Sequence, residues 1–249
     1  MFHQSKVVSG IAALGLMAMS ASVLAENPRA AYNEPTRGFF IEHGIVSGPR
    51  KVSAELHTGS DDVDVGGGVR LGLPNSELII TSGIQAEDTT EALLKWGLND
   101  SVSAGRSSTT ATFDWAALIG VSHTDNENQN GQSTLDQTNI SVGAALTINS
   151  DAATFTLVPE LVYKDGTVQD DTFIDVSIGA YVGIIDTPSG LFSAGVEALF
   201  TSEDDADNSY AFGARWAYNE RVNLDLVPFV FSEGDQIGFP GMVRLNVSL

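Results

Sequence analysis

The sequence predicts an all-β protein, a closed antiparallel transmembrane up-and-down β-barrel of about twelve strands. Three observations indicate this fold: an export signal at the start of the chain, apolar residues at alternate positions in segments of about ten residues, and connections that alternate between short and long. A soluble sheet would need only the second of them. Barrels of about ten or fourteen strands are the alternatives.

The composition is that of a folded and strongly acidic chain. It has 249 residues, no cysteine, 43% hydrophobic and 18% charged residues, which supplies enough apolar side chains for one large domain or two small ones. Acidic residues outnumber basic ones 32 to 12, a formal net charge of −20, which argues against nucleic acid as a partner. The lack of cysteine removes disulfides and thiolate chemistry.

The first 25 residues have the layout of a secretory signal peptide. Lys6 precedes a mostly apolar run over residues 7–19, and small residues lead to a cleavage site after Ala25. The run is too short for a transmembrane helix, which needs roughly 20 apolar residues. We therefore expect an exported protein with an N-terminal lead over residues 26–50 and a barrel over residues 51–249. The lead can be disordered, a short strand or a plug.

Beyond the signal, apolar residues repeat with a period of two rather than with the period of a helix. In the last segment, Val243, Leu245 and Val247 alternate with Arg244 and Asn246. Such a pattern predicts strands that have one apolar and one polar face. Strands with this alternation are expected at 113–121, 140–148, 174–184, 192–200, 210–218 and 222–230, and further candidates lie at 51–58, 66–74, 76–86 and 89–98.

The second face of these strands distinguishes a membrane barrel from a soluble sandwich. It mixes Gly, Ala, Ser and Asn with isolated charges, which suits a narrow wet lumen better than a solvent-washed sheet. Aromatic residues such as Trp115, Phe200 and Trp216 lie near the ends of the apolar faces, as in membrane-interface girdles. Val230 has the parity of Leu226 and is expected outside with it. The charges expected to line the lumen are Arg70, Lys95, Asp114, Glu160, Asp175, Glu197, Arg215, Asp225 and Arg244.

The connections alternate in length along most of the chain. Turns such as NER at 219–221 alternate with loops such as SEDDADN at 202–208, and residues 87–90 are expected to form another loop. The strand number depends on residues 99–110, which give about twelve strands if they form one long connection, the reading we prefer. Additional strands at 101–107 and near 38–46 would raise the number to about fourteen.

Together these features resemble a Gram-negative outer-membrane β-barrel protein of the small porin-like class, and the likeness covers nearly the whole mature chain. The resemblance implies a location in the cell outer membrane, contact with its lipid and lipopolysaccharide, and recognition of the last strand by the barrel-assembly machinery. Leu249 departs from the terminal Phe that is usual in that class. The residues that would form this insertion signal are Gly241, Val243, Leu245, Val247 and Leu249.

The chain shows no pattern of a catalytic, metal or cofactor site. No H-E-x-x-H or G-x-S-x-G motif is present. Ser122 and His123 are adjacent on a strand, so their side chains face opposite sides and do not pair. The stretch NENQNG at 126–131 begins like a calcium loop, but Gln137 stands where a bidentate Glu is needed. We expect no enzyme activity, no metal and no cofactor.

The functional signal lies in the predicted lumen. Acids there outnumber bases, which favours passage of small cations or neutral polar solutes over anions. The first hypothesis is therefore a narrow porin-like channel for passive diffusion. The alternatives are a non-conducting structural or adhesive barrel with acidic external loops, a lipid hydrolase active at the rim, and a soluble exported β-sandwich. The sequence leaves open the solute, the oligomeric state, and whether the lumen is open or plugged.

Overall fold

The structure is a computed structural model of the chain that describes residues 37–47, 49–59, 65–84, 87–98, 102–104, 111–127, 133–150, 153–166, 170–203, 206–219, 221–232 and 241–249. The predicted signal peptide and the stretch 128–131 of the calcium-like motif lie outside these residues. Within the described part of the chain, no helix is long and apolar enough to cross a membrane.

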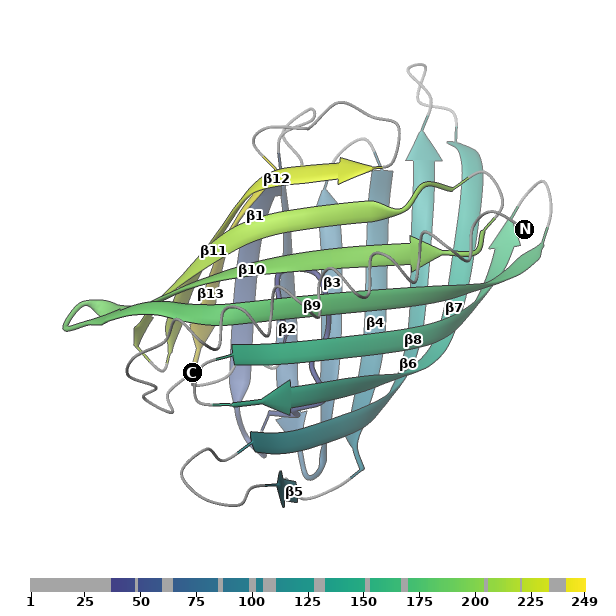
Figure 1. The fold of residues 1–249 in the computed structure, drawn as a ribbon. Coiled ribbons are helices and arrows are strands. Elements are labelled where there is room, and N and C mark those ends of the chain that lie inside the picture. Colours follow the sequence, from purple (N-terminus) through teal and green to yellow (C-terminus); the bar gives the residue numbers. More distant parts are fainter. Residues whose placement is uncertain are drawn as a thin grey trace.

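The described regular structure is entirely β (Figure 1). Each strand pairs antiparallel with its neighbours in the chain, apart from the connection around β5. The strands are β1 (Val52–Gly59), β2 (Val65–Leu73), β3 (Ser76–Ile84), β4 (Glu87–Gly97), β5 (Val102–Ala104), β6 (Ala111–Glu127), β7 (Ser133–Asn149), β8 (Ala153–Gly166), β9 (Asp171–Thr187), β10 (Gly190–Thr201), β11 (Ser209–Asn219), β12 (Val222–Ser232) and β13 (Met242–Ser248).

Two pairings close the sheet into a ring. β13 pairs with β1 along seven residue pairs, from Ser53 opposite Ser248 to Gly59 opposite Met242. β4 pairs directly with β6, so the three-residue β5 is left beside the end of β6 and outside the ring. The prediction of a closed twelve-strand barrel is confirmed, and barrels of ten or fourteen strands and the β-sandwich are wrong.

One predicted loop belongs to a strand. Residues 87–90 were expected to connect two strands, but β4 already begins at Glu87 and continues the pairing with β6 as far as Asn126. The two threonines of this stretch are β-branched and favour an extended backbone, and Thr89 Oγ1 lies 2.9 Å from Thr124 Oγ1 across the pair. The connection between β3 and β4 is therefore reduced to residues 85–86.

The two ends of the barrel differ in their connections. One end, called the turn end here, carries the connections 74–75, 150–152, 188–189 and 220–221 and the segment that includes β5. The other, called the loop end, carries connections 60–64, 85–86, 128–132, 167–170, 202–208 and 233–241. The alternation of short and long holds except at two places: the connection 85–86 at the loop end is short, and residues 98–110, which include β5, form a long connection at the turn end. β1 begins and β13 finishes at the turn end, where the Leu249 N–H donates to the Val52 carbonyl at 2.7 Å.

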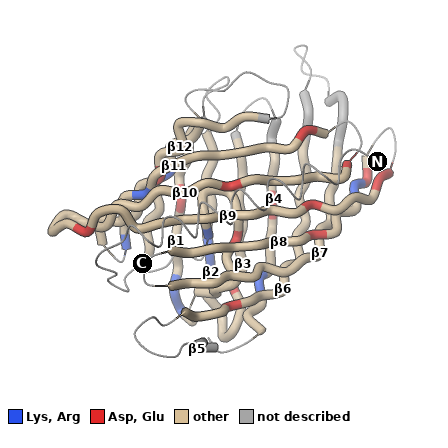
Figure 2. Tube along the Cα trace, viewed as in Figure 1, with Lys and Arg blue, Asp and Glu red and all other residues tan. Residues whose placement is uncertain are grey.

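The outer face of the ring is apolar. Residues that alternate with the inward charges are exposed, among them Leu56, Ile119, Val142, Leu161 and Ile174, each with more than half of its surface accessible. Figure 2 shows that acidic and basic residues occupy only isolated positions along the strands. Phe200 is an exception to the expected exposed girdle, because it is buried on this outer face among Ile178, Ala198 and the ring of Tyr210.

Val230 does not share the outward face of Leu226, contrary to the sequence pattern. The register between β11 and β12 shifts between Phe212 and Ala214, so an extra residue is inserted near Pro228. Pro has no N–H for the ladder and is typically accommodated at such irregularities. After the shift Phe229 points outward and Val230 packs with the buried residues of the lumen.

The inside of the barrel is filled by the chain itself. Residues 37–47, called the lumenal segment here, lie inside the ring and fold back on themselves where Arg37 pairs with Glu42. The Gly38 N–H donates to the Ile41 carbonyl at 2.7 Å to close this turn. Because the Arg50 N–H bonds to Gly72 beside the 74–75 turn, the segment enters from the turn end.

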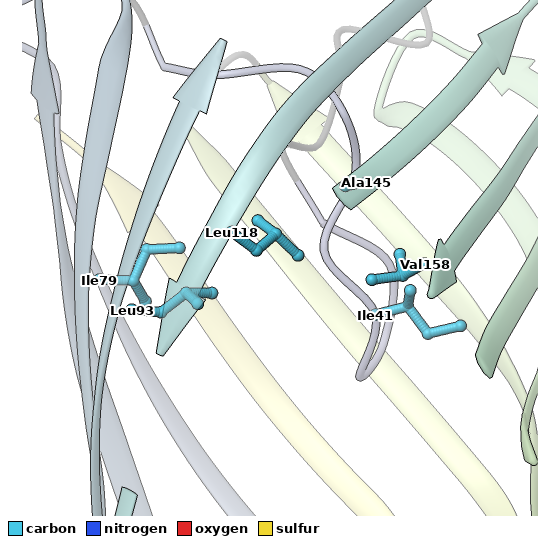
Figure 3. Packing of buried hydrophobic residues seen from close by; sticks show 6 residues of the cluster. All are labelled: Ile41, Ile79, Leu93, Leu118, Ala145 and Val158. Atoms are coloured by element: carbon cyan, nitrogen blue, oxygen red, sulfur yellow. The ribbon is translucent and has the colours of Figure 1, made fainter. Parts of the chain in front are cut away.

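Two apolar clusters join the segment to the wall. Ile41 lies beside Val158, and the other members of the cluster come from other strands: Ile79, Leu93, Leu118 and Ala145 (Figure 3). Phe39 packs with Tyr181, Val227 and Met242 in the second cluster. The N-terminal lead was expected to be disordered, a short strand or a plug. Residues 37–47 lie inside the barrel, as a plug does.

Candidate functional site in the lumen

Two arginines and one aspartate of the wall bind the turn of the lumenal segment. Asp225 on β12 accepts from Arg215 Nε at 2.5 Å and from Arg244 Nη2 at 2.6 Å, so it lies between two cations. Both arginines also donate to carbonyl groups of the segment, and Arg244 Nη2 reaches the Gly38 oxygen at 2.7 Å. Asp225 and Arg244 are fully buried. Buried charges are tolerated when they are paired and hydrogen-bonded in this way.

A second group of charged residues binds the lumenal segment at Glu42, on the other side of the turn. Glu42 bonds to Arg70 on β2, and Lys95 Nζ on β4 lies 3.1 Å from Glu42 Oε2. Glu77 on β3 lies 3.1 Å from the same Lys95 and accepts from Ser47 Oγ at 2.8 Å. Burial opposes ionisation of Glu42, yet the charges of Arg70 and Lys95 hold its pKa well below its ordinary value. Glu42 is therefore an anion that two wall cations retain.

Glu197 on β10 accepts hydrogen bonds from the backbone of the turn. Its carboxylate accepts from the N–H groups of Phe39 and Phe40 and from the Tyr181 hydroxyl. These bonds satisfy backbone donors that would otherwise be unpaired inside the barrel, where an unmade hydrogen bond is costly. The wall thus supplies acceptors for the N–H groups and donors for the carbonyls of the same turn.

Tyr181 fits inside the barrel because glycines surround it. The ring of Phe39 meets it edge-on, with ring centroids 5.7 Å apart. A Cβ atom at Gly38 or Gly195 would overlap the Tyr181 side chain, so these positions accept only glycine without movement. The Tyr181 hydroxyl is thereby directed at Glu197 and the turn.

Two further contacts complete the attachment. Arg37 Nη1 lies 2.7 Å from Glu55 Oε2 on β1. The Gly44 N–H donates to Thr147 Oγ1 at 2.8 Å, and a Cβ at Gly44 would collide with the Asp114 carbonyl. The segment is thus bonded to strands on all sides of the ring.

All nine charged residues predicted for the lumen lie on the inward face, but only some of them contact the lumenal segment. Arg70, Lys95, Glu197, Arg215 and Arg244 bind the lumenal segment directly. Asp225 neutralises two of these cations, and Asp114 is buried beside Gly44. Glu160 and Asp175 stand apart from this set; they are opposite one another on β8 and β9 and are only partly buried.

Sequence reasoning missed the residues that complete the site. Glu55, Glu77 and Glu91 have inward parity on β1, β3 and β4, so a full reading of those strands would have included them. Arg37 and Glu42 belong to the lumenal segment, which is not a strand of the ring and has no periodic signal.

Residues that the structure describes line two cavities beside the segment, each of about 270 Å³. They share Phe40, Ile41 and Ser177, so both adjoin the turn. The first is lined further by Glu91 and Glu160, and the second by other residues that include Val230. On β4, Glu91 is four residues nearer the loop end than Lys95, so the first cavity lies on the loop side of the ionic contacts.

The structure also places the residues of the other predicted sites. Gly241 precedes β13, Val243 and Leu245 face outward on it, and Leu249 is largely exposed. His123 on β6 lies 3.0 Å from Thr138 Oγ1 on the exposed face, while Ser122 faces the inside. Among the described residues there is no group of three or more His, Asp or Glu side chains that could hold a metal ion.

Comparison with known proteins adds a fold likeness only. No family model and no curated protein matches the chain. A solved structure described as "Bacterial polysaccharide outer membrane secretin" is similar at 14% sequence identity and a TM-score of 0.35, over 82% of this chain and 99% of that chain. So weak a likeness carries no argument about function, which rests on the geometry of the lumen.

Proposed function

We propose that the chain is a non-enzymatic outer-membrane β-barrel whose narrow lumen passes small cations or neutral polar solutes when the lumenal segment is displaced. The observation that carries this proposal is the chemistry of the plug. The segment is attached to the wall through ionic and hydrogen-bonded contacts at Glu42, Glu197, Arg215 and Arg244. Walls of this kind are wetted once the plug leaves, so they support a polar pathway.

The outward face supports the membrane part of the proposal. Large apolar side chains are exposed all round the ring, for example Leu56 on β1, Ile119 on β6 and Ile184 on β9. Soluble monomers rarely expose such extensive apolar surface, whereas a lipid-facing barrel requires it. Outer-membrane lipid, lipopolysaccharide and the assembly machinery that would read the last strand are the corresponding proposed partners.

The inward charges support the proposed selectivity. The lumen presents Glu55, Glu77, Glu91 and Glu160 in addition to the acids that were predicted to line it near the arginines, Glu197 and Asp225. Displacement of the segment removes Arg37 together with Glu42, so the remaining wall keeps its excess of acids. An acid-rich narrow pore favours cations over anions.

A second function is supported by the pairing of the buried charges. Arg244, Lys95, Glu77 and Asp225 are fully buried and paired, and two apolar clusters join the segment to the wall. A barrel whose interior is this well satisfied can serve as a non-conducting structural or adhesive element. The acidic residues that such a role would use, including Asp61, Asp62, Asp204 and Asp205, lie outside the described residues.

Single-channel recording distinguishes the two functions. The mature full-length protein is inserted into planar bilayers with a KCl gradient, and wild type is compared with Glu197→Gln, which removes one acceptor oxygen from the turn. The channel proposal expects infrequent discrete openings with a cation-biased reversal potential, and roughly tenfold more open time in the variant. Asp186→Asn, at an exposed position of β9 near the turn end, is the matched control.

A folded, heat-modifiable barrel that never conducts in wild type or in the variant contradicts the channel and supports the structural barrel. An anion-biased reversal potential contradicts the proposed selectivity.

A further inference from the structure

The cavity on the loop side of the lumenal segment, called the Phe40 cavity here, has two chemically different surfaces. Its volume is about 270 Å³, which suits a molecule smaller than a typical drug. One surface is apolar and is formed by Phe40 and Ile41 of the segment with Leu118 and Val158 of the wall. The other carries the carboxylates of Glu91 on β4 and Glu160 on β8.

These two carboxylates differ from the other acids that line the same cavity. Glu55 is paired with Arg37 at 2.7 Å, and Glu42 is paired with both Arg70 and Lys95. Glu91 accepts a long hydrogen bond from Thr81 Oγ1 at 3.4 Å. In the part of the chain that the structure describes, no ion pair joins Glu91 or Glu160 to a basic side chain. Arg37 also lines the cavity but is paired with Glu55, so the carboxyl groups of the lining outnumber its basic side chains.

Phe40 provides a second and independent observation. Its neighbours Phe39 and Ile41 are almost completely buried in the two apolar clusters, whereas 50% of the Phe40 surface is exposed inside the barrel. An aromatic side chain on the tip of a tightly bound turn, directed into open space, offers an apolar surface and a ring face that attracts a cation.

We infer that the Phe40 cavity binds a small aliphatic diamine. Its two ammonium groups would lie at Glu91 and Glu160, and its hydrocarbon chain would lie against Phe40 and Ile41. Carboxylates in a partly water-excluded cavity form strong charge-assisted hydrogen bonds with ammonium groups. The apolar surface distinguishes such a ligand from an inorganic cation, which has no hydrocarbon to bury. This inference goes beyond the proposed channel and does not require that the lumen conducts.

Calorimetry on the mature full-length protein in a nonionic detergent tests the inference. The probe is 1,5-diaminopentane, and 1,5-pentanediol is its uncharged counterpart of similar size. We expect saturable binding of the diamine and at least about tenfold weaker binding of the diol, because the diol lacks the charge that the carboxylates recognise. Potassium and magnesium chloride at equal ionic strength are titrated separately, since weak screening alone is expected from them.

Variants assign the binding to the cavity. Glu91→Gln/Glu160→Gln preserves side-chain shape and is expected to weaken diamine binding at least about tenfold. Phe40→Ala removes the apolar surface and is expected to weaken it by a smaller factor, without disturbing the wall. Asp186→Asn, distant from the lumen in an exposed position, is expected to bind like wild type. Heat-modifiable gel mobility checks that each variant is folded.

Three results overturn the inference: no saturable diamine binding by wild type, equal binding of diamine and diol, or unchanged binding by the folded double carboxamide variant. Competition by magnesium at the affinity of the diamine also overturns it, in favour of an inorganic-cation site. Because the readout is binding, its failure is independent of whether the barrel conducts.

Discussion

Lys95 Nζ on β4 lies 3.1 Å from Glu42 Oε2 of the lumenal segment, and the two residues are 53 positions apart in the chain. The lysine side chain is completely buried, so water cannot replace Glu42 as its partner without opening the barrel interior. This ion pair therefore couples the position of the segment to the charge balance of the wall. Substitution of Glu42 is the most direct test of that coupling.

Glu42→Gln is expected to loosen the segment. It keeps Glu77 beside Arg70 and Lys95 but removes the anion that holds the turn between them. The cost of breaking such a buried pair is of the order of 3 kcal/mol, enough to raise the open time of the proposed channel by tenfold or more. Single-channel recording of folded wild type and variant measures the change, with Asp186→Asn as control; equal open times would show that Glu42 is not an anchor.

Acid is expected to release the segment through the same residue. The pKa of Glu42 in the folded protein lies below its ordinary value of 4.5, so its contribution is fully present above that value. It is lost as the pH falls further toward the lowered pKa of the folded state. The open time should therefore rise as the pH is lowered below about 4.5. The rise should be smaller in Glu42→Gln, which has no carboxyl group to protonate at that position. An identical pH profile in the two proteins would contradict the assignment.

Asp225→Asn is expected to be the most destabilising single change in the wall. Asp225 is fully buried between Arg215 and Arg244, at 2.5 and 2.6 Å, and its neutralisation removes the carboxylate that both buried arginines bind directly. Loss of one partner from a buried ionic group costs about 3–5 kcal/mol. The midpoint of urea unfolding in detergent, followed by gel mobility, measures the loss. A midpoint equal to that of Asp186→Asn would mean that the two arginines are solvated.

The sequence predicts the barrel well because alternate residues of each strand face the outside and the lumen, and these two faces differ in polarity. Phe113, Trp115 and Ile119 are exposed on one face of β6, and Asp114 is buried on the other. The pattern fails where the backbone departs from regular pairing. The register shift near Pro228 turns Val230 inward. Alternation of apolar residues in the sequence cannot predict such an inserted residue.

The site is less predictable than the wall. The nine inward charges follow from parity, but their purpose depends on the lumenal segment, whose residues Arg37 and Glu42 have no repeat and pair with strands far away in the chain. Tyr181 was overlooked because it stands among glycines on the polar face of β9. Its role becomes visible only when Gly195 of β10 is placed opposite it.

The glycine opposite Tyr181 permits a direct test of how the wall positions the turn. A Cβ at Gly195 would overlap the Tyr181 ring and lie 3.1 Å from Phe39 Cε2, so Gly195→Ala must displace one of these rings. Gly183→Ala is the matched control, because its nearest neighbour would be Leu191 Cδ1 at an ordinary 3.9 Å.

Overpacking of this kind typically costs about 1–3 kcal/mol. We expect Gly195→Ala to lower the urea midpoint and to increase open time, since Tyr181 can no longer donate to Glu197, while Gly183→Ala changes neither. If both variants behave alike, Tyr181 fills space in the lumen without positioning Glu197, and the attachment of the turn depends on the arginines and on Glu42 alone.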